Sequence, residues 1–380
     1  MLDKEKSYIK DWSVIKFKDC IKQLNTGLNP RTHFSLGKGN IRYITAKNIT
    51  KYGNIDFSSA DFIDNEAKEI IHKRSDIQVG DILFSSRAPI GHCCLIKESP
   101  DFYDIGESIF SIRVDKKVVL PEYMSLYLSS DYFIKLATKQ VTGSIILEIR
   151  ISDLMNTNII VPPINIQEKI ANCLKQIDEK IQGNNAINNN LQQVATTLYD
   201  FLFAKKQPNG KLSDILLENE KSTIQVGSSD NICGNYPFFT SGETINEWQD
   251  YFVDGINCYL STGGNASIKV YAGKAAYSTD TWCIYGKENY SSYLYFYLKS
   301  IIKSINSSYF AGSGLKHLQK DALLDIDLYI PTKDEIKTFN KIANPILIQA
   351  SQLFIESKKL IKQRDFLLPL LMNGQATIDE

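Results

Sequence analysis

Two stretches decide the organisation of this chain: GSIILEIRISDLMNTNIIVP at residues 143–162 and GSGLKHLQKDALLDIDLYIP at residues 312–331. Both begin with Gly-Ser, carry a leucine in the middle, and end in an apolar pair followed by proline. The two glycines lie 169 residues apart, and so do the two closing prolines. Agreement at both ends with one offset indicates an internal repeat.

The repeat continues on both sides of these stretches. Upstream, PEYMSLYLSS at 121–130 matches SSYLYFYLKS at 291–300. Downstream, the tetrapeptide Lys-Ile-Ala-Asn occurs at 169–172 and again at 341–344. Matches in the same order at nearly one offset predict two copies of a unit of about 170 residues.

Each copy is predicted to begin with a globular domain of mixed helices and strands. Short alternating apolar runs bounded by turn residues predict strands, and Pro121 suits the first turn of a helix. The expected elements are strands at 41–44 and 110–114, a strand–turn–strand at 79–96 and again at 257–271, and helices at 121–139 and 291–305. The predicted fold class is therefore α+β.

Each copy is predicted to end in a long helix, because apolar residues recur in sevens. The seam residues are Ile170, Leu174, Ile177, Ile181, Leu191 and Leu198 in the first helix, and Ile346, Leu353, Leu360 and Leu367 in the second. One such helix cannot bury its stripe alone. We expect the two to form an antiparallel coiled coil with an internal pseudo-two-fold; the alternative is that each packs on its own domain.

Local signals mark the ends of these helices. Asn165-x-x-Glu168 and Thr332-x-x-Glu335 are both predicted to be capping boxes, in which side chains satisfy free N–H groups at a helix start. Pro345 and Pro369 are expected to kink or end the second helix, because proline lacks the N–H that a helix interior needs.

The composition restricts the class of protein. Lys+Arg and Asp+Glu are both 43, so a nucleic-acid binder with this balance must concentrate its basic residues or borrow charge from a partner. The opening MLDKEKSYIK lacks a signal-peptide core, and no segment approaches a membrane span. Seven cysteines without a CxxC pair predict reduced thiols and a cytoplasmic location.

Motifs of catalysis are not found in the sequence. Neither Leu36-Gly37-Lys38-Gly39 nor Ala272-Gly273-Lys274-Ala275 has the spacing of a nucleotide-binding loop. The tetrad with which amino-methyltransferases grip a flipped base does not occur. The four histidines do not have metal-ligand spacing. We therefore predict no catalytic site, no cofactor and no metal.

A series of short motifs runs along nearly the whole length of the sequence. They are Trp12 with Phe17-x-Asp19, Thr26-Gly27, Ile41-Arg42-Tyr43-Ile44-Thr45 with Lys47-Asn48-Ile49, Gly80-Asp81-Ile82-Leu83 leading to Arg87 and Gly91, Gly143-Ser144 before Ile160-Val161-Pro162-Pro163, and Gln167-Glu168-x-Ile170-Ala171. In these motifs the sequence resembles the specificity subunits of type I restriction–modification systems. The second copy departs from this pattern, with Gly255-Ile256-Asn257 where Gly-Asp-Ile would stand.

The resemblance implies a non-catalytic subunit that reads a bipartite, gapped sequence in double-stranded DNA. It also implies docking to two DNA methyltransferase subunits and, through them, to a motor-nuclease subunit, away from membranes. The implied domains are target-recognition domain 1 at 1–162, spacer helix 1 at 163–205, target-recognition domain 2 at 206–331 and spacer helix 2 at 332–380. The alternatives are a recognition subunit of another multisubunit restriction or methylation enzyme, and a coiled-coil scaffold that binds proteins only.

Candidate DNA contacts lie where turns would present polar side chains. Arg87 sits at a turn beside two serines, and its fork suits the major-groove edge of guanine; a surface salt bridge is the alternative. The side chain of Asn48 suits a bidentate pair of hydrogen bonds with adenine; the alternative is that it forms a turn. For Gly143-Ser144 and Gly312-Ser313 a structural turn is favoured. The candidates are Arg42, Lys47, Asn48, Ser85, Ser86 and Arg87 in the first copy, and Ser261, Thr262, Asn265, Lys269, Lys274, Lys316 and His317 in the second.

Overall fold

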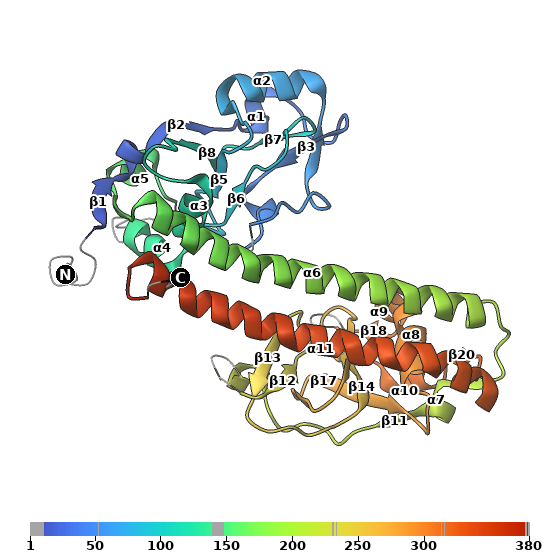
Figure 1. Cartoon of the computed structure of the whole chain (residues 1–380). Helices are drawn as coiled ribbons and strands as arrows, with labels where there is room; N and C mark the ends of the chain where they lie inside the picture. The colour runs from blue at the N-terminus through green and yellow to red at the C-terminus, as the bar shows by residue number, and fades with distance from the viewer. Residues whose placement is uncertain are drawn as a thin grey trace. The chain divides into compact units, whose positions relative to one another are not determined.

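The computed structural model describes residues 11–51, 53–138, 148–229, 232, 234–312, 314, 316–376 and 378. The chain divides into two compact units, Met1–Lys180 with Leu360–Glu380, and Ile181–Lys359. Each unit combines one head of mixed helices and strands with part of the two long helices, α6 (Ile164–Phe203) and α11 (Lys333–Met372) (Figure 1). The four domain limits expected from the sequence stay a prediction.

The first head contains two small sheets and a strand pair. The four-stranded antiparallel sheet has the order β2 (Ile21–Thr26), β8 (Ile109–Val114), β5 (Ile82–Ser85), β6 (Cys93–Leu95). The three-stranded sheet has the order β4 (Asp61–Ile63), β3 (Ile41–Ile44), β7 (Tyr103–Ile105), with β3 and β7 parallel. The pair is β1 (Ser13–Lys16) with β9 (Asn158–Val161).

Short helices complete the first head. They are η1 (Phe17–Cys20), α1 (Pro30–His33), η2 (Ala46–Asn48), α2 (Asn65–Ser75), α3 (Pro121–Ser129), α4 (Asp131–Thr138) and α5 (Ile151–Asn156). The helix expected at 121–139 is interrupted at Ser130, whose backbone is extended. Its side-chain oxygen accepts the N–H of Phe133 at 3.2 Å, so this serine ends one helix and caps the next.

The second head repeats the strand order of both sheets and of the strand pair. Its four-stranded sheet is β11 (Leu216–Glu218), β17 (Thr281–Gly286), β14 (Ile256–Ser261), β15 (Ile268–Ala272), and its three-stranded sheet is β13 (Ile245–Trp248), β12 (Tyr236–Phe239), β16 (Ala276–Tyr277), with β12 and β16 parallel. The strand pair is β10 (Gly210–Lys211) with β20 (Asp327–Leu328). The predicted internal repeat of two similar domains is confirmed.

The remaining elements of the second head are η3 (Val226–Ser229), α7 (Leu212–Ile215), α8 (Ser291–Ser300), α9 (Ile302–Ser308), α10 (Lys320–Leu324), β18 (Phe310–Ala311) and β19 (His317–Leu318). The helices α8, α9 and α10 occupy the places that α3, α4 and α5 have in the first head. The helix α2 is different: it fills residues 65–75 between β4 and β5, whereas residues 249–255 between β13 and β14 form no helix. The heads therefore share a framework and differ in this helix and in the β18–β19 pair, which has no counterpart among the described strands of the first head.

The helix pair is antiparallel. In the second unit, Asn184 donates to the Glu356 carboxylate at 2.9 Å, and further along α6 the ring of Tyr199 lies 6.5 Å from that of Phe339. Residue numbers that rise along α6 thus meet numbers that fall along α11, as the heptads predicted. Five of the ten seam residues are buried, and the other five are half-buried: Ile177, Leu191, Leu198, Leu360 and Leu367.

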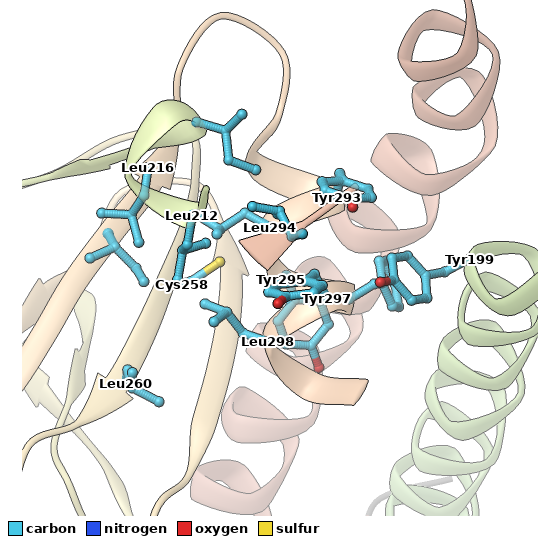
Figure 2. Packing of buried hydrophobic residues seen from close by; sticks show 14 of the residues in the cluster. Tyr199, Leu212, Leu216, Cys258, Leu260, Tyr293, Leu294, Tyr295, Tyr297 and Leu298 are labelled. Atoms are coloured by element: carbon cyan, nitrogen blue, oxygen red, sulfur yellow. The ribbon is translucent and has the colours of Figure 1, made fainter. Parts of the chain in front are cut away.

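The second head is joined to the helix pair through aromatic packing (Figure 2). Tyr199 of α6 lies 5.7 Å from Tyr293 of α8, between ring centres, and α8 in turn packs on the sheet through Leu294 and Leu298. In the first unit, Tyr123 and Tyr127 of α3 belong to the same buried cluster as the seam residues Ile170 and Leu174 and as Leu371 of α11. The core of each head is therefore continuous with the seam of its unit.

Neither proline ends α11, which runs without a break from Lys333 to Met372. The prediction that they end the helix is wrong. Pro345 is exposed, so the carbonyl that lacks its helical N–H partner can be hydrated, while neighbouring seam residues such as Ile346 remain buried. Packing of the apolar stripe outweighs the lost hydrogen bond.

Only one of the two predicted capping boxes exists. Asn165 lies inside α6, which already begins at Ile164, so it does not cap the helix. Thr332 does cap α11: its N–H donates to the Glu335 carboxylate at 2.9 Å, and its hydroxyl accepts the Glu335 N–H at 3.3 Å. Bonds from the Thr332 N–H and the Tyr329 hydroxyl lower the pKa of Glu335 to about 2.

Described cysteines are free, and Cys20, Cys93, Cys94, Cys258 and Cys283 are buried. Burial raises the pKa of Cys94 to about 11, so its thiol stays protonated. Across the part of the chain that the structure describes, no helix is apolar enough over sufficient length to span a membrane. Within the same residues, no group of three His, Cys, Asp or Glu side chains is placed to hold a metal ion.

The capping box gives a pH-dependent prediction. Because the pKa of Glu335 is about 2 in the fold against an ordinary value of 4.5, its carboxylate stabilises the fold above pH 4.5 and loses this contribution as the pH falls towards 2. In thermal unfolding, the Tm of Glu335→Ala should be lower than that of the wild type at pH 7, and this difference in Tm should disappear below pH 4. Asp334→Ala, a neighbouring exposed carboxylate, is the control, and a gap independent of pH would contradict the assignment.

The buried ion pair of the first unit gives a second prediction. Arg364 is 5% exposed, and its Nε lies 2.7 Å from the Asp178 carboxylate, whose pKa is raised by burial. Arg364→Ala leaves that carboxylate buried without its partner and should cost about 3–5 kcal/mol in urea unfolding. Exposed Gln363→Ala should be nearly neutral. Replacing the pair together, by Asp178→Leu and Arg364→Met, should recover most of the loss; no recovery would contradict this account.

Candidate nucleic-acid interface

The turn after β5 is held by two buried hydroxyl groups. The side chain of Ser85 donates to the carbonyl of Pro89 and accepts the N–H of His92 at 2.9 Å. The N–H and the hydroxyl of Ser86 both donate to the carbonyl of Ser108, at 3.0 and 3.1 Å. Both serines are 0% exposed, so they position the turn and do not present their hydroxyls to a ligand.

Arg87 stands on this turn between two carboxylates. Its Nη1 donates to Glu107 at 2.8 Å and its Nε donates to Glu148 at 3.0 Å. The arginine side chain is 39% exposed, and the two carboxylates, Glu107 foremost, raise its pKa further. The guanidinium is therefore fixed in direction at the surface, in the salt bridge that the sequence left as the alternative.

Asn48 has a structural position. It is 3% exposed, its amide oxygen accepts the N–H of Thr45 at 2.8 Å, and its amide nitrogen donates to the carbonyl of Asp56 and the hydroxyl of Ser59. These contacts use both ends of the amide, as a turn-forming asparagine does. The preceding residue, Lys47, is exposed on the same 3-10 turn.

Arg42 lies along the three-stranded sheet. Its Nη1 donates to the carbonyl of Ala60 at 3.1 Å, and its guanidinium lies 3.9 Å from the centre of the Phe62 ring. These contacts hold the side chain against β4, although it remains half-exposed.

The turn after β14 in the second head is held in the same way. The hydroxyl of Ser261 donates to the carbonyl of Asn265 at 2.8 Å and accepts the N–H of Ser267 at 2.9 Å. The N–H and hydroxyl of Thr262 both donate to the carbonyl of Asp280. The side chain of Asn265 is exposed at the end of the turn.

Two basic candidates lie beside this turn. Gly263 forms a β-bridge with His317, and the N–H of Gly264 donates to the carbonyl of Lys316 at 3.0 Å. Both Lys316 and His317 are exposed. The structure therefore brings 261–265 and 316–317 together.

The other two lysines are placed differently. The Nζ of Lys269 donates to the carbonyls of Thr240 and Gly242, and burial lowers its pKa. Lys274 follows the far end of β15, away from the turn, and its Nζ lies 4.4 Å from the centre of the Tyr251 ring. Neither belongs to the group formed by 261–265 and 316–317.

Sequence reasoning missed Glu107 and Glu148, the partners of Arg87. A signal for Glu148 was present, because it precedes His317 by the same 169 residues that separate the repeated prolines. The Gly143-Ser144 pair and Ser313 lie outside the described residues.

Comparisons with known proteins agree with this architecture. The family model described as the type I restriction modification DNA specificity domain matches twice, at residues 9–193 and 207–363. The two matches cover most of the chain, and the chain therefore belongs to this family.

Curated relatives carry the same description. The chain is 26% identical over 176 residues to the type I restriction enzyme HindI specificity subunit of Haemophilus influenzae, covering 44% of this chain and 37% of that one. It is 30% identical over 204 residues to the MjaIX specificity subunit of Methanocaldococcus jannaschii, covering 52% of this chain and 45% of that one. The chain thus spans less than half the length of these relatives.

A solved structure shares the fold over nearly the full chain. The S subunit of a type I restriction-modification system from M. genitalium superposes with a TM-score of 0.62, covering 97% of both chains at 16% identity. At that identity the likeness supports the fold alone.

Proposed function

We propose that this chain is the DNA-recognition subunit of a type I restriction–modification complex, non-catalytic itself and acting in the cytoplasm. Each head reads one half of a bipartite, gapped target in double-stranded DNA. The observation that carries the proposal is the repetition: two heads of one topology present equivalent turns, after β5 and β14, each held by the same pair of hydroxyl contacts. Two equivalent readers in one chain suit a target made of two half-sites.

The surface side chains at these turns suit the two kinds of DNA contact. Arg87 has a fixed guanidinium that can face a base edge, and exposed Lys47, Lys316 and His317 can approach phosphates. Ser85, Ser86 and Asn48 act behind this surface, because they are buried and hydrogen-bonded within the protein.

The partners of the proposal are two DNA methyltransferase subunits, with a motor-nuclease subunit joining through them. A second apolar stripe on α6, distinct from the seam and exposed, supports this docking. Ile187, Val194 and Phe201 follow one another at intervals of seven, so they lie on one face, and they are 49%, 55% and 84% exposed. Large apolar side chains grouped on one helix face are typical of a protein interface.

Methylome sequencing of the host with and without this gene tests the proposed function. We expect a gapped methylated motif that disappears when the gene is deleted and returns with it on a plasmid. A protein-only scaffold predicts an unchanged methylome, and that result would reject DNA recognition. A motif without a gap would reject the two-reader arrangement.

Arg87→Ala should damage recognition of one half-site and leave the other readable. Loss of a bidentate base contact costs roughly 1–3 kcal/mol. Methylation of genomic sites measures this directly, with Lys117→Ala, an exposed lysine after β8, as the control. An unchanged motif with full methylation would show that Arg87 does not contact the DNA target.

The double variant Val194→Glu and Phe201→Glu should reduce co-purification of the methyltransferase subunits by about ten-fold or more, because it places charge in an apolar contact. Val79→Glu, at an apolar residue of the first head with 57% exposure, is the matched control. Equal recovery of the partner with all variants would contradict docking on this stripe.

A further inference from the structure

The two heads provide an internal comparison of equivalent positions. Ser85 and Ser261 each donate to a carbonyl four residues on. Ser86 and Thr262 each make two hydrogen bonds to the carbonyl that precedes the paired strand, β8 or β17. These positions keep the same contacts in both heads. They form a common scaffold and cannot distinguish one DNA sequence from another.

The next position keeps its place in the fold but changes its chemistry. Arg87 forms a β-bridge with Glu148, and Gly263 forms the equivalent bridge with His317. An arginine and a carboxylate in the first head thus correspond to a glycine and an imidazole in the second.

A third position follows from the scaffold. The carbonyls that accept from Ser86 and Thr262 belong to Ser108 and Asp280, so the residues just before them correspond as well. These residues are Glu107, which binds Arg87, and Thr279. All three positions of the first head are about 40% exposed at the surface of the turn.

We propose that these three equivalent positions determine the specificity of each head, and that the trio Arg87, Glu107 and Glu148 reads a G·C pair. The inference rests on the proposed function and deepens it. In the second head the corresponding trio, Gly263, Thr279 and His317, carries no carboxylate and reads a different base pair.

The hydrogen-bonding capacity of the first trio supports this reading. Arg87 uses Nε and Nη1 towards the carboxylates, and among the described residues no protein acceptor meets its Nη2. That edge can donate to O6 and N7 of guanine, while a carboxylate oxygen can accept from N4 of cytosine. Both bases of one pair are then read by neighbouring side chains.

Charge favours bases over the phosphate backbone as the contact. The trio has one positive and two negative side chains, so a phosphate placed against it would meet net repulsion. Base edges carry no net charge, and cytosine offers the donor that a carboxylate needs. The same two carboxylates hold the guanidinium in one direction, which reduces the entropy lost on binding.

The experiment replaces the trio of the first head by the residues of the second head in the full complex. Methylome sequencing then measures which sites are methylated. We expect the wild-type motif to contain a fixed G·C pair in one half-site. The variant R87G/E107T/E148H should tolerate other base pairs at that position and leave the other half-site unchanged. Lys117→Ala, at an exposed residue after β8, should leave the whole motif unchanged.

Arg87→Lys keeps the proposal testable if the triple variant does not fold. Lysine keeps the charge but loses the fork, so discrimination at the same pair should fall about ten-fold or more. Unchanged motifs in the folded variants would overturn the proposal, as would wild-type half-sites that both lack a fixed G·C pair. A methylome that does not respond to deletion of the gene would instead reject the proposed function itself.

Discussion

Burial of the seam between α6 and α11 is the constraint on which the other parts of the structure depend. Each helix has 40 residues and an apolar stripe that the other helix covers. In each unit this seam is continuous with the core of a head, through Tyr199 and Phe339 in one and through Ile170 and Leu371 in the other. A head separated from its part of the helix pair would expose these residues. In each unit, the head and its part of the helix pair are therefore expected to fold together.

Polar residues within the seam restrict how the helices can pair. Leucine and isoleucine at repeating positions would tolerate a shift by one heptad, because an apolar side chain has no required partner. Asn184 hydrogen-bonds to Glu356 in the second unit, and Asp178 forms an ion pair with Arg364 in the first, and each pair meets in one register. Their desolvation costs stability, so their effect is better explained as specificity of register than as strength of association.

Sequence reasoning was most successful where the signal was local or repeated. Strand periodicity, heptads and a constant offset predicted both heads and the helix pair, because these depend on spacing along the chain. The points that the sequence left open depend on contacts between distant segments. Asn48 is committed to Asp56 and Ser59 within a fold that only tertiary packing closes, and Arg87 meets carboxylates 20 and 61 residues away. Pro345 was misjudged because seam packing, which involves the other helix, outweighs local propensity.

The charge of the chain indicates how affinity and discrimination are divided. The chain is neutral overall, and the trio on the first head has more negative than positive groups. Under the proposed function, little counterion release comes from such a surface, so the non-specific part of DNA affinity comes from basic residues elsewhere on the chain or from positive charge on partner subunits. A recognition surface with weak attraction to phosphate has an advantage in that arrangement. It adds little to binding at wrong sequences and contributes free energy only where the base edges match its hydrogen-bonding groups.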